Sequence, residues 1–355
     1  MKRIAWAWFL ASALLAACAT ATPAAPAPAN EATLPSTPAS APSSAAAESA
    51  ATPEANVAEA AQPLKLVASF SVIADWLQNV AGERATIIAL AGAEAEPHEY
   101  EPTPQDSVRL AEADLVFEIG AGFETWLDRL YEASGSRAQR VVLSEGLELR
   151  PFGGHEHEHE HGEGEHKQEE GEHKHEHEHG EFDPHVWQNP QNVIKMVERI
   201  AEALKAADPA GAETYARNAE RYIEQLSALD AEIEQLVSQI PKERRKIATS
   251  HEALGYFADR YGFEIIPIFI APGELNQPSA QAIAEVVKRL REEEVAVIFG
   301  ESVGDVPALE SIARESGAKL GPVLFTDALF APGKPGSTYL DAMRYNARTL
   351  VDVLR

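Results

Sequence analysis

The sequence has few of the residues from which thiolate metal sites and nucleic-acid surfaces are built. It contains one cysteine, Cys18, among 355 residues, so disulfides within the chain and sites made of several thiolates are excluded. Clustered basic residues, which contact with a phosphate backbone requires, are missing from a chain whose formal net charge is -26. A bound metal would therefore depend on nitrogen and oxygen ligands, and no nucleic-acid partner is expected.

Motifs of two common hydrolase classes are also missing outside the repetitive His/Glu segment. The pair His251 and Glu252 lacks the second histidine of a metalloprotease HExxH motif, and no nucleophile elbow occurs. A zinc hydrolase remains the rival from a different class, because three protein ligands and a water form a catalytic zinc site. We expect a protein that is not an enzyme.

The first 63 residues differ in composition from the rest. Residues 1–18 begin with Lys2 and Arg3, continue with an apolar stretch and end in "LAAC", which predicts an export signal too short to span a membrane. This end resembles bacterial lipoprotein signals, which implies that Cys18 is lipidated and anchors the protein at the extracytoplasmic face of the membrane, at the cell surface or in the periplasm. The alternative is a general signal peptide in which Cys18 is incidental. Residues 19–63, rich in Ala and Pro, predict a disordered tether.

From Leu64 onward, short apolar runs alternate with helical patterns, which is typical of βα units. Two sets of four candidate strands predict an α/β protein of two lobes, each with a mostly parallel four-stranded sheet and flanking helices. The candidate strands lie near residues 64–70, 85–91, 114–120, 140–145, 245–250, 263–270, 295–301 and 319–327.

One long helix is expected between the lobes. The run from Ala212 to Ile240 has no Gly or Pro and carries a single apolar stripe. Two helices broken near Ala228, or a dimerising coiled coil, are the alternatives. We therefore divide the folded part into a first lobe at 64–209, a connecting helix at 210–240 and a second lobe at 241–355, and expect a monomer.

The histidines fall into two groups. Nine of the twelve lie in a repetitive His/Glu loop at 153–182, where alternating donors without fixed geometry favour weak binding and fast exchange of metal. An acidic insert that only keeps the protein soluble is the alternative. These nine are His155, His157, His159, His161, His166, His173, His175, His177 and His179.

The other three histidines, His98, His185 and His251, each sit in a segment with its own local pattern. His251 directly follows a predicted strand and is expected to start a helix. Glu301 and Asp327 also follow predicted strands, and ligands of open α/β sheets gather at the carboxyl ends of strands. Each acid could instead cap the helix that follows.

Together these segments resemble the metal-specific solute-binding proteins of bacterial ABC importers, the group that takes up zinc or manganese. The resemblance runs from about Leu64 to the C-terminus and includes "PHEYEPTP", "DPHVWQNP", "SHEALGYFADRYG", "FGES" and "FTDALF". It implies two α/β lobes bridged by one long helix and an ABC permease as partner. It places the metal ligands on His98, His185, His251 and Asp327, with Glu301 supporting a ligand histidine rather than binding the metal.

In that family the third ligand is commonly His in zinc proteins and Glu in manganese proteins, and here it is His251. Three imidazoles and one carboxylate suit Zn²⁺ in a four-coordinate cage, whereas Mn²⁺ favours more oxygen. We therefore expect an extracytoplasmic receptor that captures Zn²⁺ between its lobes and delivers it to the permease. A manganese or iron receptor of the same family, and a metal-storage lipoprotein, are the alternatives.

Overall fold

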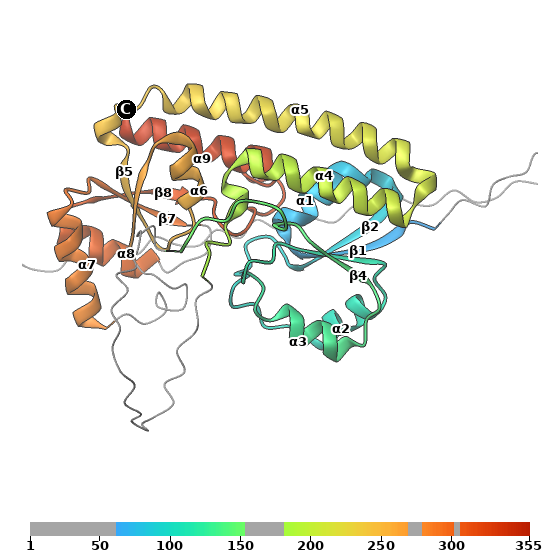
Figure 1. Cartoon of the computed structure of the whole chain (residues 1–355). Helices are drawn as coiled ribbons and strands as arrows, with labels where there is room; N and C mark the ends of the chain where they lie inside the picture. Colours follow the sequence, from blue (N-terminus) through green and yellow to red (C-terminus); the bar gives the residue numbers. More distant parts are fainter. Residues whose placement is uncertain (1–61, 153–180, 269–278, 302–305) are drawn as a thin grey trace, which may run out of the picture. The chain divides into compact units, whose positions relative to one another are not determined.

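The computed structural model describes residues 62–152, 181–268, 279–301 and 306–355 (Figure 1). The predicted signal peptide with Cys18, nearly all of the predicted tether, and the nine histidines of the His/Glu loop lie outside the described residues. Within the described ranges, no helix combines the length and the hydrophobicity needed to cross a bilayer.

The first lobe contains a parallel sheet with the strand order β2-β1-β3-β4. Its strands are β1 (Leu64–Phe70), β2 (Ala85–Ala91), β3 (Leu115–Glu118) and β4 (Gln139–Val142). The helices between them are α1 (Ser71–Ala81), α2 (Pro104–Ala111) and α3 (Leu127–Ser134). A Thr103–Asp106 capping box with Pro104 at the first helical position fixes the start of α2.

The second lobe repeats this arrangement, with four parallel strands in the order β6-β5-β7-β8. Its strands are β5 (Lys246–Thr249), β6 (Glu264–Pro267), β7 (Val297–Glu301) and β8 (Lys319–Leu324). The helices of this lobe are α6 (Gly255–Tyr261), α7 (Ala280–Glu292) and α8 (Val306–Ser316). The predicted fold class is confirmed.

A long helix, α5 (Ala212–Val237), connects the lobes and lies beside α4 (Pro190–Ala207) and α9 (Tyr339–Leu354) (Figure 1). Its 26 residues correspond to a rod of about 39 Å. The chain enters it through a short 3-10 turn, where the Asp208 side chain accepts a hydrogen bond from the Gly211 N–H. The helix is held by a stripe of buried side chains: Tyr215, Ala219, Tyr222, Leu226, Leu229, Asp230, Ile233 and Val237.

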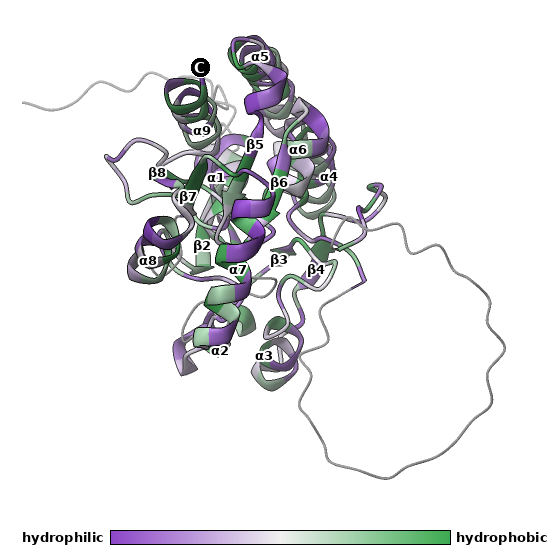
Figure 2. Ribbon diagram, turned by 90° about the vertical axis from the view of Figure 1, so that its left-hand side faces the viewer, coloured by the Kyte–Doolittle hydropathy of each residue, from purple (hydrophilic) through white to green (hydrophobic). Residues whose placement is uncertain are grey.

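One hydrophobic core runs through both lobes by way of these helices. It includes Phe117 of the first sheet, Phe299 of the second and Leu226 of α5. Smaller clusters cover the opposite face of each sheet, under α2 and α3 in the first lobe and under α7 and α8 in the second. Each sheet is therefore buried on both faces, as parallel sheets usually are, and its helices are hydrophilic along only part of their surface (Figure 2).

Candidate metal centre

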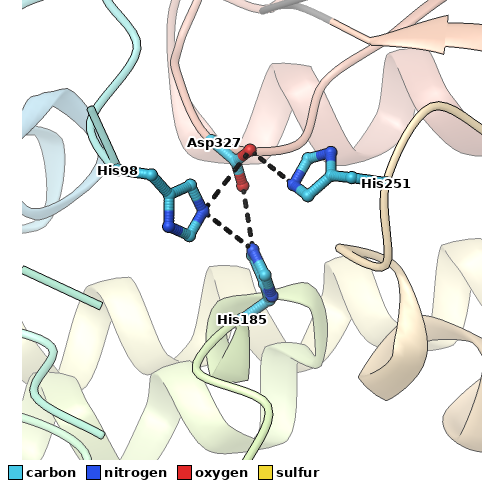
Figure 3. A group of neighbouring side chains, drawn as sticks. All are labelled: His98, His185, His251 and Asp327. Atoms are coloured by element: carbon cyan, nitrogen blue, oxygen red, sulfur yellow. Dashed lines mark hydrogen bonds and ion pairs between the residues drawn. The ribbon is translucent and has the colours of Figure 1, made fainter. Parts of the chain in front are cut away.

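Four side chains from both lobes converge on one point (Figure 3). His98 lies in the loop after β2, and His185 immediately precedes the 3-10 turn that leads into α4. His251 comes two residues after β5, and Asp327 comes three residues after β8. Because all strands of a parallel sheet end at the same edge, residues distant in sequence arrive at a common place.

The ligand atoms of this group lie within 4.8 Å of one another. The His98 and His185 Nε2 atoms are 3.1 Å apart, and the His251 Nε2 atom is 2.9 Å from Asp327 Oδ2. The carboxylate also lies 3.5 Å from His185 Nε2, through Oδ1, and 3.9 Å from His98 Nε2, through Oδ2. In all three imidazoles the Nε2 atom therefore faces the Asp327 carboxylate.

The group is buried, and its polar atoms are poorly satisfied by the protein. Both carboxylate oxygens of Asp327 are shielded from solvent, and neither accepts a well-aligned hydrogen bond within the described part of the chain. The side chains of His185, His251 and Asp327 are at most 3% exposed, whereas that of His98 is 15% exposed. A cation at the centre would satisfy the buried carboxylate, and His98 marks the side from which it would enter.

Three further carboxylates hold the histidine backbones, one for each histidine. The N–H groups of His98, His185 and His251 donate to Glu96 Oε1 (2.9 Å), Asp183 Oδ1 (3.0 Å) and Glu301 Oε1 (2.9 Å), respectively. Two of these carboxylates also touch the imidazole of the same residue. Asp183 Oδ1 lies 2.7 Å from His185 Nδ1, and Glu301 Oε2 lies 2.6 Å from His251 Nδ1. A carboxylate at Nδ1 fixes the tautomer that leaves Nε2 free to bind a metal.

Aromatic rings form the wall on the side of the first lobe. The ring of Phe123 packs edge-on against His98, with centroids 4.5 Å apart, and against Trp187 at 4.8 Å. The Trp187 indole N–H donates to the carbonyl of Thr326, the residue before Asp327, as does the side-chain amide of Gln188. Residues of the first lobe therefore position the backbone that carries the carboxylate of the second lobe.

The electrostatics of the metal-free group centre on His251 and Asp327. Burial alone would lower the pKa of His251, but the Glu301 and Asp327 carboxylates outweigh it and raise that pKa well above the usual value. Burial alone would raise the pKa of Asp327, but the imidazoles, His251 first, hold it well below its usual range. The pKa of Glu96 is raised to about 7 by burial and by the charge of Asp327.

The structure departs from the sequence expectation in the segment after β5. His251 does not start a helix, because α6 begins only at Gly255 and residues 250–254 form a loop. The carboxylate of Glu252, in the same loop, lies 3.1 Å from the Arg150 guanidinium. The loop frees the backbone of His251 to turn its side chain toward the other ligands.

Sequence reasoning also missed Glu96 and Asp183. Each stands two residues before a histidine and one before a proline, in "EPH" and "DPH". An acidic side chain at this spacing can accept the N–H of the residue two positions on, and the proline between them restricts the backbone to conformations that suit such a turn. The recurrence of an acid-Pro-His triplet at two histidines was therefore the signal.

Comparison with known proteins shows which proteins the whole chain is similar to. Residues 66–353 match the model of the family described as "Zinc-uptake complex component A periplasmic". The iron-binding protein YfeA of Yersinia pestis is 33% identical over 302 residues, which cover 85% of this chain and 89% of that protein. The manganese-binding lipoprotein MntA of Halalkalibacterium halodurans is 32% identical over 304 residues, which cover 85% of this chain and 92% of that protein.

Among solved structures, the chain is similar to the periplasmic zinc-binding protein TroA from Treponema pallidum. The TM-score is 0.70 at 26% identity, and the match covers 82% of this chain and 99% of the other. The chain therefore shares its fold with TroA, and the three similar proteins are named for three different metals.

Proposed function

Because the chain belongs to the zinc-uptake complex component A family, whose members are periplasmic metal-binding receptors of ABC transporters, we propose that it captures Zn²⁺ and delivers it to an ABC permease. His98 and His185 of the first lobe and His251 and Asp327 of the second would bind the ion. The observation that carries this proposal is the convergence of three imidazoles, two of them buried, on one buried carboxylate that no other residue in the described ranges satisfies.

Both the chemistry and the spacing of this group support zinc. Ligand atoms about 2.0–2.1 Å from a tetrahedral ion are separated from one another by about 3.3 Å. Four separations between ligand atoms, 2.9, 3.1, 3.5 and 3.9 Å, lie on both sides of that value, and all the ligand atoms lie within 4.8 Å of one another. A cage of three nitrogen atoms and one oxygen atom also suits zinc better than manganese, which prefers oxygen ligands. Four protein ligands leave no open position for a catalytic water, which argues against a hydrolase.

A manganese or iron receptor is the second candidate. The names of YfeA and MntA favour it, since they state iron and manganese binding at 33% and 32% identity. The position of Asp327 is also compatible with it, because both carboxylate oxygens face the histidines and a two-oxygen contact would raise the coordination number.

Protons compete with the metal for this site. The raised pKa of His251 means that the metal-free imidazole keeps a proton between Glu301 and Asp327, and the metal must displace it. Zinc affinity should therefore fall as the pH drops through neutrality and below about 6.5, the ordinary histidine value. An affinity that stayed flat between about pH 7.5 and about pH 5.5 would exclude a site of three histidines.

The remaining parts of the chain have roles consistent with uptake. We propose that a lipid on Cys18 anchors the monomer at the extracytoplasmic face of the membrane and that residues 19–63 tether the folded part. The His/Glu loop would gather zinc weakly beside the tight site, since nine imidazoles alternate there with carboxylates. These proposals rest on sequence and on the family.

The test measures which metal the protein holds and how tightly. Metal content is determined after purification without added metal, and zinc and manganese then compete for the metal-free protein in calorimetry. We expect one tight zinc site, retained when residues 155–179 are deleted. The variant Asp327→Asn keeps the shape of the side chain but removes its charge, and it should weaken zinc binding about 1,000-fold or more, because a dication would meet only neutral ligands.

Two results would contradict the proposal. If the site prefers manganese in the competition, the protein is a manganese receptor, the second candidate, and not a zinc receptor. Loss of the tight site on deletion of residues 155–179 would show that the His/Glu loop, and not the four converging side chains, holds the metal.

A further inference from the structure

Arg150 lies where the two lobes meet, outside the group of four ligands. Its Nη1 atom is 3.2 Å from Asp183 Oδ2 of the first lobe and 3.1 Å from Glu252 Oε1 of the second. Its Nε atom donates to Asp259 Oδ2 at 3.1 Å. One guanidinium group thus joins the segment before His185 to the segment after His251.

The backbone around Arg150 is fixed to the same two segments. The Asp183 N–H donates to the Arg150 carbonyl at 2.8 Å, and the Arg150 N–H donates to the Tyr256 hydroxyl at 2.9 Å. That hydroxyl in turn donates to the Asp183 carbonyl at 2.9 Å. Hydrogen bonds therefore link Arg150, Asp183 and Tyr256 in a ring across the two lobes. They fix the backbone from which the Arg150 side chain extends.

The space for the guanidinium depends on a glycine. Gly255 is the first residue of α6, and a β-carbon there would collide with the Arg150 guanidinium and with the Asp183 carboxylate. The ion pair between Arg150 and Asp183 therefore occupies the space that a side chain at position 255 would fill. Any larger residue at 255 would push Arg150 away from Asp183 while leaving its charge in the protein.

Both carboxylates that Arg150 joins are next to metal ligands. Asp183 is fully buried, and the oxygen that does not face Arg150 holds the N–H and the Nδ1 atom of His185. Glu252 is the residue that directly follows His251 in the loop between β5 and α6. A buried carboxylate that loses its cation is left with an uncompensated charge, so it shifts or recruits another partner.

We propose that Arg150 is a positioning residue of the metal centre. By binding Asp183 and Glu252 with one guanidinium group, Arg150 sets the spacing between His185 and His251. This inference rests on the proposed function, since it assumes that the two histidines bind the metal. Arg150 would not touch the ion; it acts through Asp183, which bonds His185, and through Glu252, which directly follows His251 in the chain.

The test compares Arg150→Gln with the unmutated protein, using Zn²⁺ for affinity and Co²⁺ for geometry. Loss of a group that bonds a metal ligand directly typically changes affinity 10- to 100-fold, and Arg150 acts through such a group, so R150Q should weaken zinc binding at the lower end of that range, about 10-fold. The visible absorption of the Co²⁺-loaded protein should shift, because ligand geometry changes. R150K should restore only part of the affinity, since one ammonium cannot reproduce the forked contacts of a guanidinium. G255A, which keeps the charge but displaces it, should change binding and spectrum in the same direction.

A matched control comes from the same helix. Arg260 of α6 forms a two-point ion pair with Asp230 on α5, at 2.5 and 3.1 Å, away from the histidines. R260Q should lower the free energy of unfolding without changing the Co²⁺ spectrum or the zinc affinity. If R150Q does not fold, R150K and G255A carry the test.

The outcomes separate this inference from the proposed function. If R150Q and G255A bind zinc as tightly as the unmutated protein, with the same Co²⁺ spectrum, the positioning role is refuted. An equal loss of affinity in R150Q and R260Q would also refute it, because that result indicates a general loosening. Failure of the unmutated protein to bind zinc would instead refute the proposed function.

Discussion

The two lobes have the same strand order, yet they use an equivalent feature for different purposes. In each sheet the third strand along the chain ends in a buried glutamate, Glu118 in β3 and Glu301 in β7. Glu118 receives both arms of Arg140, at 2.8 and 2.7 Å. Glu301 holds the N–H and the imidazole of His251. The role of a glutamate at the end of a strand therefore depends on the side chain that it contacts, an arginine for Glu118 and a histidine for Glu301.

The ligands of both lobes contact carboxylates, but ring contacts are found beside the histidines of the first lobe. In the first lobe, His98 and His185 lie in loops and pack against the rings of Phe123 and Trp187. In the second lobe, His251 lies close to the end of a strand between two carboxylates. Ring contacts orient an imidazole without charging it, whereas a carboxylate at Nδ1, present at His185 and at His251, makes it more basic. We therefore expect metal binding to be more sensitive to changes at these carboxylates than to changes at the rings.

The largest effect expected outside the four proposed ligands concerns the place where helices α1, α5 and α9 pack together, and it tests whether stability can change without a change at the metal centre. Asp75 of α1 accepts hydrogen bonds from the Tyr339 N–H at the start of α9 (3.1 Å) and from the Tyr222 hydroxyl of α5 (3.3 Å). The residue is partly exposed, but its carboxyl group is packed between these helices. Burial, more than the nearby Asp341, raises its pKa to about 6. The folded state therefore binds its proton more tightly than the unfolded state does.

It follows that stability from Asp75 is present below about pH 4 and is lost as the pH rises through about 6. The variant D75N should not lose stability over this pH range, because asparagine does not titrate. The unfolding free energies of wild type and D75N, measured in urea without metal, should therefore diverge by on the order of 3 kcal/mol in favour of D75N between about pH 4 and about pH 7. E224Q, which removes an exposed carboxylate from α5, controls for the loss of one charge. Parallel profiles for wild type and D75N would contradict the assignment.

The next effect tests the comparison of the two glutamates directly. Glu301→Gln should keep the hydrogen bond from the His251 N–H but lose the acceptor at Nδ1, and it should weaken zinc binding 10- to 100-fold. Glu118→Gln is the matched variant, because it removes the charge of the other strand-end glutamate, which faces Arg140. It should lower stability and leave zinc affinity, measured by chelator competition, unchanged. Equal losses of affinity would show that the two glutamates do not differ in role.

The smallest effect tests the aromatic wall of the first lobe. Phe123→Leu removes the ring that orients His98, and such ring contacts contribute about 0.5–1.5 kcal/mol, so zinc affinity should fall about 3- to 10-fold. Phe257→Leu is the control, because its buried ring packs against Tyr261 and Phe263 instead. Calorimetry with zinc should separate the two variants, whereas their unfolding free energies should fall by similar amounts. A loss of affinity larger than that of E301Q would show that the ring contact matters more than the carboxylate at Nδ1.

The sequence by itself determined the two α/β lobes, the long helix between them and the residues that came together. Apolar periodicity reports burial, and a residue after a predicted strand reports a place in the sheet, so the amino-acid pattern placed His251, Glu301 and Asp327 at strand ends. The resemblance to the family then singled out Asp327 as a ligand and added His98 and His185. The acid-Pro-His triplets also carried local information about Glu96 and Asp183.

Only the tertiary structure decided which groups face the histidines. The loop that delays α6 to Gly255, the contact of Phe123 with His98, and the joining of Asp183 to Glu252 by Arg150 all depend on segments far apart in the chain. Local pattern fixes which face of an element is buried, because that depends on the period of helix or strand. The partner of a buried charge depends on how whole elements pack, which no single segment encodes.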